Sequence, residues 1–227
     1  MKNIALILAS GTGERCNLGY PKQFAKINNK TIIEYTIDAF ENNSHIDEIF
    51  LVTSNECLPI LQDIILKANY KKVMGVIEGG LTRKDSSYNG ISAIDETEAN
   101  VLIHDGVRPL VSQEIINNCI ATLEDVNALC VTIDSTDTIY EIDNDNNITK
   151  IPQRKTLRRA QTPQCFKLSL IKRAHELANK DISCQVTDDC GLIMHYKLDK
   201  IRTINGDVNN IKITYTEDIE FAKRFLR

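Results

Sequence analysis

Short apolar runs alternate along the chain with segments whose apolar residues recur at helical spacing. The first run, Ile4–Ala9, is apolar throughout, as is typical of a strand buried on both faces of a parallel sheet. Four more strands are predicted, at 48–53, 72–77, 99–104 and 128–133, and the segments between them predict helices at 31–40, 58–67, 86–93 and 113–124. Asp85 is a candidate N-cap of the third helix. This order predicts an α/β fold with a doubly wound, mostly parallel sheet.

The strand–helix alternation breaks after residue 134. Between Thr136 and Arg159, two stretches of alternating polarity (138–142 and 148–151) flank the turn-rich segment 143–147, which predicts a β-hairpin. Its stem has little apolar content, so we expect it to be marginal alone and to pack on another subunit. An ordinary solvent-exposed hairpin is the alternative. Beyond it the pattern predicts further elements at 168–179 (helix), 200–204 (strand) and 216–226 (helix).

Composition and charge narrow the class of protein. With 227 residues, 42% of them hydrophobic, we expect a single folded domain over 1–227, with 136–159 as its arm. The apolar runs are too short to span a bilayer, so no membrane association is predicted. A net charge of −4 excludes a broad nucleic-acid-binding surface, and anions must be bound by a few local cations. Seven scattered Cys without a C-x-x-C pair predict reduced thiols and a cytoplasmic location.

A glycine-rich turn follows the first predicted strand, at the sheet edge where α/β proteins bind ligands. Such a turn lets backbone N–H groups approach phosphate oxygens closely. Cys16 replaces the third glycine of a dinucleotide-binding fingerprint, the second strand ends without an acidic residue, and no G-K-[ST] of a P-loop follows. Instead, Arg15 and Lys22 bracket the turn, as a triphosphate would require. The pattern therefore favours a nucleoside triphosphate.

Eight stretches in chain order carry a resemblance to a known family. They are LASGTGER (8–15), GYPKQF (19–24), GGLTRKDSSYNGI (79–91), IHDGVRP (103–109), DTI (137–139), QTPQCF (161–166), TDD (187–189) and NIKIT (210–214). Together they resemble the CTP-dependent cytidylyltransferases that act on sugar-alcohol phosphates. The resemblance implies a Rossmann-like nucleotidyltransferase sheet and a homodimer whose protomers exchange their hairpin arms.

The resemblance also implies roles for individual residues. It implies a nucleotide site at Leu8, Ala9, Ser10, Gly11, Gly13, Gly79, Gly80, Arg83, Ser86 and Asp105. It implies Mg²⁺, or another divalent cation, at Asp105, a carboxylate at the tip of a strand. The implied catalytic cations are Arg15, Lys22, Arg154 and Lys212. The implied contacts to the polyol phosphate are Arg108, Thr138, Arg154 and Lys212, of which Arg108 has loop bracing as an equal alternative. Arg154 and Thr138 lie in the arm, so we expect them to act in the partner's site.

The expected reaction is transfer of a cytidylyl group from CTP to a polyol phosphate. Three stretches resemble the sequences of one branch of this family: LGYPKQF, HDGVRPL, and DTIYEI followed by IPQR. That branch acts on D-ribitol 5-phosphate and feeds teichoic-acid or capsule polymers. The absence of Trp points the same way. Two alternatives stay open. One is the branch that acts on 2-C-methyl-D-erythritol 4-phosphate in isoprenoid precursor synthesis, and the other is a non-catalytic nucleotide-binding protein of the same fold.

Overall fold

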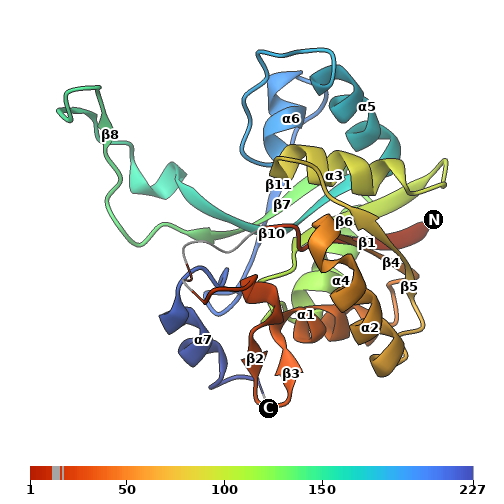
Figure 1. Cartoon of the computed structure of the whole chain (residues 1–227). Helices are drawn as coiled ribbons and strands as arrows, with labels where there is room; N and C mark the ends of the chain where they lie inside the picture. The colour runs from red at the N-terminus through yellow and green to blue at the C-terminus, as the bar shows by residue number, and fades with distance from the viewer. Residues whose placement is uncertain (12–15, 17, 227) are drawn as a thin grey trace.

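A seven-stranded sheet runs through the middle of the molecule (Figure 1). The computed structural model describes residues 1–11, 16 and 18–226. The strands are β1 (Lys2–Leu8), β4 (Glu48–Thr53), β5 (Val73–Glu78), β6 (Ala99–Asp105), β7 (Ala128–Asp134), β10 (Arg158–Lys167) and β11 (Arg202–Asn205). Their order is β11-β7-β10-β6-β1-β4-β5, and only the pairs made by β10 are antiparallel. The predicted α/β fold with a mostly parallel sheet is confirmed.

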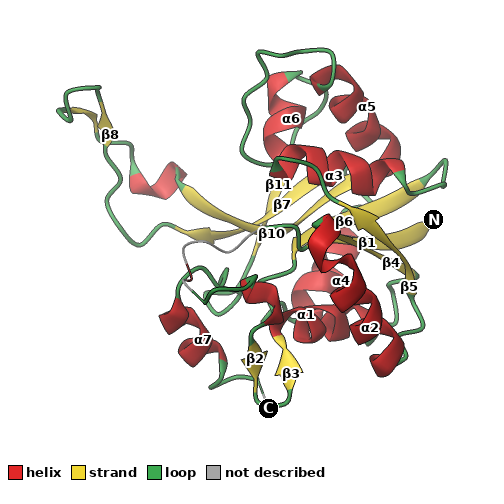
Figure 2. Cartoon of the chain, viewed as in Figure 1, coloured by secondary structure: helices red, strands yellow, loops and turns green. Residues whose placement is uncertain are grey.

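Helices cover both faces of this sheet (Figure 2). One layer contains α3 (Arg83–Ser92), α5 (Leu168–Ala178) and α6 (Asp189–His195), and the other contains α1 (Ile32–Glu41), α2 (Leu58–Ala68) and α4 (Gln113–Thr122). Along β1, Ile4 and Leu6 pack into the first layer, while Ala5 and Ile7 pack into the second. Since successive residues of a strand point to opposite faces, this double burial explains the continuous apolar run.

A third, smaller cluster joins the two ends of the chain. Helix α7 (Thr216–Ala222) packs against the short hairpin of β2 (Lys26–Ile27) and β3 (Lys30–Thr31) through Ile219 and Ile27. Val107, just after β6, belongs to the same cluster, and its carbonyl accepts a hydrogen bond from Ile213 N. The loop after β6 and the segment before α7 are therefore held together. Single turns of 3₁₀ helix within the described residues include η2 (Lys22–Phe24), η3 (Asn55–Cys57) and η4 (Arg154–Thr156).

The predicted hairpin is present as an arm that extends away from the sheet (Figure 1). We call residues 135–157 the arm. Its ladder is short and pairs β8 (Glu141–Ile142) with β9 (Ile148–Lys150). Apolar side chains along it are 45–59% exposed: Ile139, Tyr140, Ile142, Ile148 and Ile151. That the arm packs on a second subunit stays a prediction.

Several features of the fold differ from the prediction. Strand β10 begins in the last two residues of the expected hairpin and continues through 160–167, where no element was predicted, and α6 and the β2–β3 hairpin were not predicted either. Helix α3 begins three residues earlier than expected, and its N-cap is Thr82, so the assignment of Asp85 was wrong. Asp85 is instead the third residue of a capping box with Thr82, in which each side chain bonds the other's backbone N–H. In the part of the chain described here, no helix is long and apolar enough to cross a membrane.

Candidate active site

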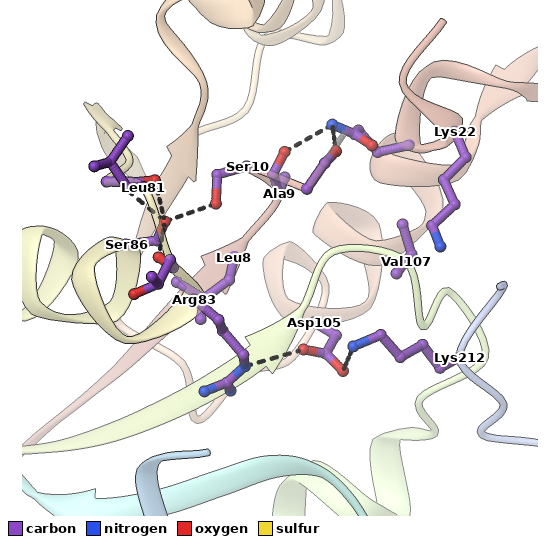
Figure 3. A pocket seen from close by; sticks show the side chains of 14 residues that line it. Leu8, Ala9, Ser10, Lys22, Leu81, Arg83, Ser86, Asp105, Val107 and Lys212 are labelled. Atoms are coloured by element: carbon purple, nitrogen blue, oxygen red, sulfur yellow. Dashed lines mark hydrogen bonds and ion pairs between the residues drawn. The ribbon is translucent and has the colours of Figure 1, made fainter. Parts of the chain in front are cut away.

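A cleft of about 520 Å³ opens at the carboxyl ends of β1, β5 and β6 (Figure 3). Because these strands are parallel, their following loops meet at one edge of the sheet. The predicted residues that line the cleft are Leu8, Ala9, Ser10, Gly11, Lys22, Gly80, Arg83, Ser86, Asp105 and Lys212. Four lining residues were not predicted: Gln23, Leu81, Thr82 and Val107. Gly13 and Arg15 lie outside the described residues.

The buried Gln23 holds the described part of the glycine turn in place. Its Nε2 donates to the carbonyl of Ala9 at 2.7 Å and to that of Gly11 at 3.2 Å (Figure 3). Gln23 is 2% exposed, so these hydrogen bonds, and not solvent, satisfy its buried amide group. Sequence reasoning missed this role, although Gln23 directly follows Lys22 in the PKQF stretch. Gln23 thereby couples η2 to the turn after β1.

A network of hydroxyl groups joins the two glycine-containing turns. Ser10 Oγ donates to Ser86 Oγ at 2.8 Å, and Ser86 Oγ also accepts from the backbone N–H of Gly80 at 3.2 Å. A Cβ atom at Gly79 would lie 2.8 Å from Ser10 Cβ and 2.9 Å from Ser86 Oγ. Gly79 itself does not line the cleft, but only a glycine allows this close approach. Gly79, Gly80 and Ser86 therefore lie beside the turn after β1, and their role in nucleotide binding stays a prediction.

Asp105 lies at the floor of the cleft among three positive side chains. Lys212 Nζ and Arg108 Nε lie 3.2 Å and 3.1 Å from its Oδ2, and Arg83 Nε lies 3.8 Å from its Oδ1. Burial would raise the pKa of the Asp105 carboxyl. The charges of Lys212, Arg83 and Arg108 outweigh that effect and hold the pKa well below its usual range. Asp105 is therefore a carboxylate that gathers cations from β6, α3 and the segment before α7.

Arg108 has a bracing position in this structure. It is 9% exposed and does not line the cleft, and its Nη1 donates to the carbonyl of Asn210 at 2.8 Å while its Nε pairs with Asp105. Its own carbonyl accepts from His104 Nε2 at 3.1 Å. The Thr162 hydroxyl accepts from Asp105 N and donates its own proton to His104 Nδ1. The proton of the neutral imidazole is therefore on Nε2, which is the ring donor. Arg108 thus ties the Asp105 carboxylate to the loop that carries Lys212.

Two predicted site residues lie away from this cleft. Thr138 and Arg154 belong to the arm, where Arg154 Nη2 donates to Thr138 Oγ1 at 3.1 Å. Both are exposed and neither lines the cleft of its own chain. Their expected place of action is the site of a partner subunit. It stays a prediction.

The donor set of the cleft suits a metal that arrives with a triphosphate. Among the described lining residues Asp105 is the one carboxylate, and no group of three His, Cys, Asp or Glu side chains capable of holding a metal occurs in the described chain. Mg²⁺ is commonly held by one or two carboxylates together with substrate phosphates and water. Asp207, which precedes the segment with Lys212, does not line the cleft, and its Oδ1 accepts from Asn209 N at 2.8 Å. Asp105 fits the predicted Mg²⁺ role, which stays a prediction.

Comparisons with known proteins agree on one family. The model of the IspD family, 2-C-methyl-D-erythritol 4-phosphate cytidylyltransferase, matches residues 3–227. A bifunctional ribulose 5-phosphate reductase/CDP-ribitol pyrophosphorylase of Haemophilus influenzae is 39% identical over 230 residues, with 100% of this chain and 48% of that protein covered. The chain therefore spans about half the length of this relative.

Two further matches cover nearly the full length of both partners. A 2-C-methyl-D-erythritol 4-phosphate cytidylyltransferase of Lachnospira eligens is 39% identical, with 99% of each chain covered. The crystal structure of a 4-diphosphocytidyl-2C-methyl-D-erythritol synthase from Anaerococcus prevotii superposes with a TM-score of 0.88 at 33% identity, covering 99% of this chain and 96% of that one. Fold and sequence therefore match the same group of enzymes.

Proposed function

We propose that this chain, which belongs to the IspD family of cytidylyltransferases, transfers the cytidylyl group of CTP to D-ribitol 5-phosphate. The family makes it a nucleotidyltransferase that acts on a sugar-alcohol phosphate, so the alternative of a non-catalytic nucleotide-binding protein is set aside. The choice of ribitol is supported by the match of the whole of this chain to 48% of a relative named for CDP-ribitol formation, together with the three local stretches described above. We infer that the CDP-ribitol formed would feed teichoic-acid or capsule polymers.

A second acceptor has its own support. The matching family model carries the name of 2-C-methyl-D-erythritol 4-phosphate, and a relative with that name is also 39% identical. Both acceptors present a phosphomonoester on a polyol chain, so the same nucleotide site serves either. The acceptor is therefore the point that the experiment below must decide.

The proposed reaction is a direct displacement at phosphorus. A phosphate oxygen of the acceptor attacks the α-phosphorus of CTP, a new P–O bond forms, and the bond to the bridging oxygen breaks as pyrophosphate leaves. The phosphomonoester is already anionic near pH 7, so neither a protein nucleophile nor a strong base is required. The work of the site is positioning and neutralisation of negative charge.

The cleft residues take separate parts in this reaction. Lys22 is 7% exposed on the wall of the cleft and, with Arg15, would neutralise the transferred and leaving phosphates. Lys212, 3.2 Å from Asp105 Oδ2 and still 39% exposed at its side chain, would meet the incoming phosphate. The turn at Gly80 and the Ser86 hydroxyl would hold the nucleotide. Mg²⁺ held by Asp105 would supply positive charge to the triphosphate oxygens when bound.

The arm supports a dimeric enzyme built from single-domain protomers. Its exposed isoleucines find no cover within the described chain, and its base carries Arg154, a cation that the acceptor phosphate would need. An apolar, protruding hairpin of this kind is stabilised when it packs on a second copy related by a two-fold axis. We therefore propose that 1–227 is one nucleotidyltransferase domain and that Arg154 and Thr138 complete the partner's cleft.

The test is pyrophosphate release from CTP and Mg²⁺ with a panel of polyol phosphates. D-Ribitol 5-phosphate should give the highest kcat/KM, and replacing CTP by UTP or ATP should reduce it strongly. Preference for 2-C-methyl-D-erythritol 4-phosphate would overturn the acceptor while leaving the family assignment intact. The variant Lys22→Ala serves as the control that any turnover comes from this cleft.

A further inference from the structure

Arg83 stands between two carboxylates. Its Nη1 bonds Asp189 Oδ2 at 2.7 Å, and its Nε lies 3.8 Å from Asp105 Oδ1 (Figure 3 shows the latter pair). Asp105 lines the cleft, whereas Asp189 is 1% exposed behind it. The buried Asp189 therefore holds the Arg83 guanidinium through Nη1, while Nε is directed toward Asp105 in the cleft.

The carboxylate of Asp189 has a partner on each oxygen. Oδ1 accepts from Ser87 Oγ at 2.6 Å and from His175 Nε2 at 3.2 Å, while Oδ2 accepts from Arg83. Burial would raise the pKa of Asp189, but Arg83 and the hydrogen bonds from His175 and Ser87 hold it well below its usual range. Arg83 and Ser87 lie one turn apart on α3, so the Asp189 carboxylate contacts two side chains of the same helical turn.

Asp189 is itself held by strand β10. Gln164 Oε1 accepts the backbone N–H groups of Asp189 and Cys190, each at 3.1 Å, and Gln164 Nε2 donates to Asp188 Oδ2 at 2.7 Å. Asp188 caps α6 by accepting from Gly191 N. The two adjacent aspartates thus have different roles. Asp188 caps the N-terminus of α6, and Asp189 pairs with Arg83.

We propose that Asp189 is a positioning residue for catalysis, which holds the Arg83 guanidinium at the nucleotide and away from Asp105. Without the negative charge of Asp189, the nearest carboxylate to Arg83 is Asp105. The guanidinium then closes on Asp105 Oδ1, from which its Nε is 3.8 Å away in this structure, and leaves the nucleotide wall. When one of two carboxylates near a cation is neutralised, the remaining charged carboxylate attracts the cation more strongly. This inference rests on the proposed binding of CTP in the cleft.

A double-mutant cycle on CTP binding tests the proposal. CTP is titrated by calorimetry, with Mg²⁺ and without acceptor, into wild type, Asp189→Asn, Arg83→Gln and the double variant. Asp189→Asn should weaken CTP binding about tenfold in the wild-type background and less than about twofold in the Arg83→Gln background, a coupling within the range for contacting residues. The matched control is Asp188→Asn, which removes the neighbouring charge, keeps a good N-cap residue and should stay within about twofold of wild type.

Two outcomes would overturn the proposal. One is unchanged CTP affinity in Asp189→Asn, and the other is an equal loss in both backgrounds, which is what a purely structural role produces. If Asp189→Asn does not fold, Ser87→Ala replaces it, because it removes one hydrogen bond from the Asp189 carboxylate and leaves every charge in place. Ser87→Ala should weaken binding measurably with Arg83 present and not with Gln at 83. The acceptor is absent throughout, so a wrong acceptor assignment leaves these results unaltered.

Discussion

Replacing Gly90 by Ala should push helix α3 away from the sheet. A Cβ atom at this position would lie 2.6 Å from Leu6 Cδ1 and 2.7 Å from Val52 Cγ2, both closer than real Cβ contacts allow. Leu6 and Val52 belong to β1 and β4 and are completely buried, so neither side chain can swing into solvent. The added methyl group must therefore be accommodated by moving the helix.

The size of the effect follows from two opposing contributions. Overpacking a buried position costs about 2–3 kcal/mol here, the upper part of the usual range, because the added Cβ would lie under 3.0 Å from atoms of two buried side chains. Alanine in a helix is favoured over glycine by about 1 kcal/mol, which offsets part of that cost. The net destabilisation is about 1–2 kcal/mol, and in a chain of this length each kcal/mol lowers Tm by about 2–4 °C. We expect Gly90→Ala to lower Tm by about 2–8 °C.

The matched control is Gly75→Ala in β5. There the added Cβ would meet only Phe50 Cδ1 at 3.9 Å, an ordinary contact, so Tm should stay within about 1 °C. Since α3 carries Arg83 and Ser86 at its beginning, Gly90→Ala should also raise KM for CTP, whereas Gly75→Ala should not. Thermal unfolding and steady-state kinetics measure both effects. Equal Tm values for the two variants would refute the packing argument.

Three further predictions concern charge, pH and the arm. Lys22→Ala should lower kcat on the order of 10²-fold, as loss of one electrostatic donor does, while the exposed Lys26→Ala should not; near-normal turnover of Lys22→Ala would contradict the assignment. Burial lowers the pKa of His104 from 6.5 to about 4, so its contribution to stability is complete above pH 6.5 and lost as pH falls toward 4. Urea unfolding should show a loss of about 2 kcal/mol from this group between pH 7 and pH 5, and a His104→Gln variant should lack this component. The double variant Ile142→Lys/Ile148→Lys should sediment as a monomer and have reduced activity; a variant that still sediments as a dimer would refute the role of these side chains.

The sequence allowed the sheet to be predicted where burial on both faces leaves a continuous apolar run. β1 is the clearest case, because Ile4 to Ile7 alternate between two helix layers that are both apolar. The cleft was predictable for a related reason. Its residues come from short stretches directly after β1, β5 and β6, and parallel strands bring such stretches to one edge.

β10 and the positioning contacts could not be predicted in the same way. β10 lies in the middle of the sheet, yet Gln161, Thr162 and Gln164 interrupt its apolar pattern and are 2–5% exposed. Their hydrogen-bond partners come from segments far along the chain, such as His104 for Thr162 and Asp188 for Gln164. The Asp189 carboxylate likewise accepts from Arg83, which lies 106 residues away in sequence. Local patterns carry no information on such pairings.

The position of the arm in the chain bears on how such proteins diverge. The arm joins the end of β7 to the start of β10, which already lie side by side through the Asp134–Arg158 pair. The arm is thus a loop whose two ends are joined by strand pairing within the sheet. Each doubling of a loop's length costs only about 0.6 kcal/mol of closure entropy. Mutation can therefore change the length and the side chains of this segment over evolutionary time while the sheet and its cleft are kept.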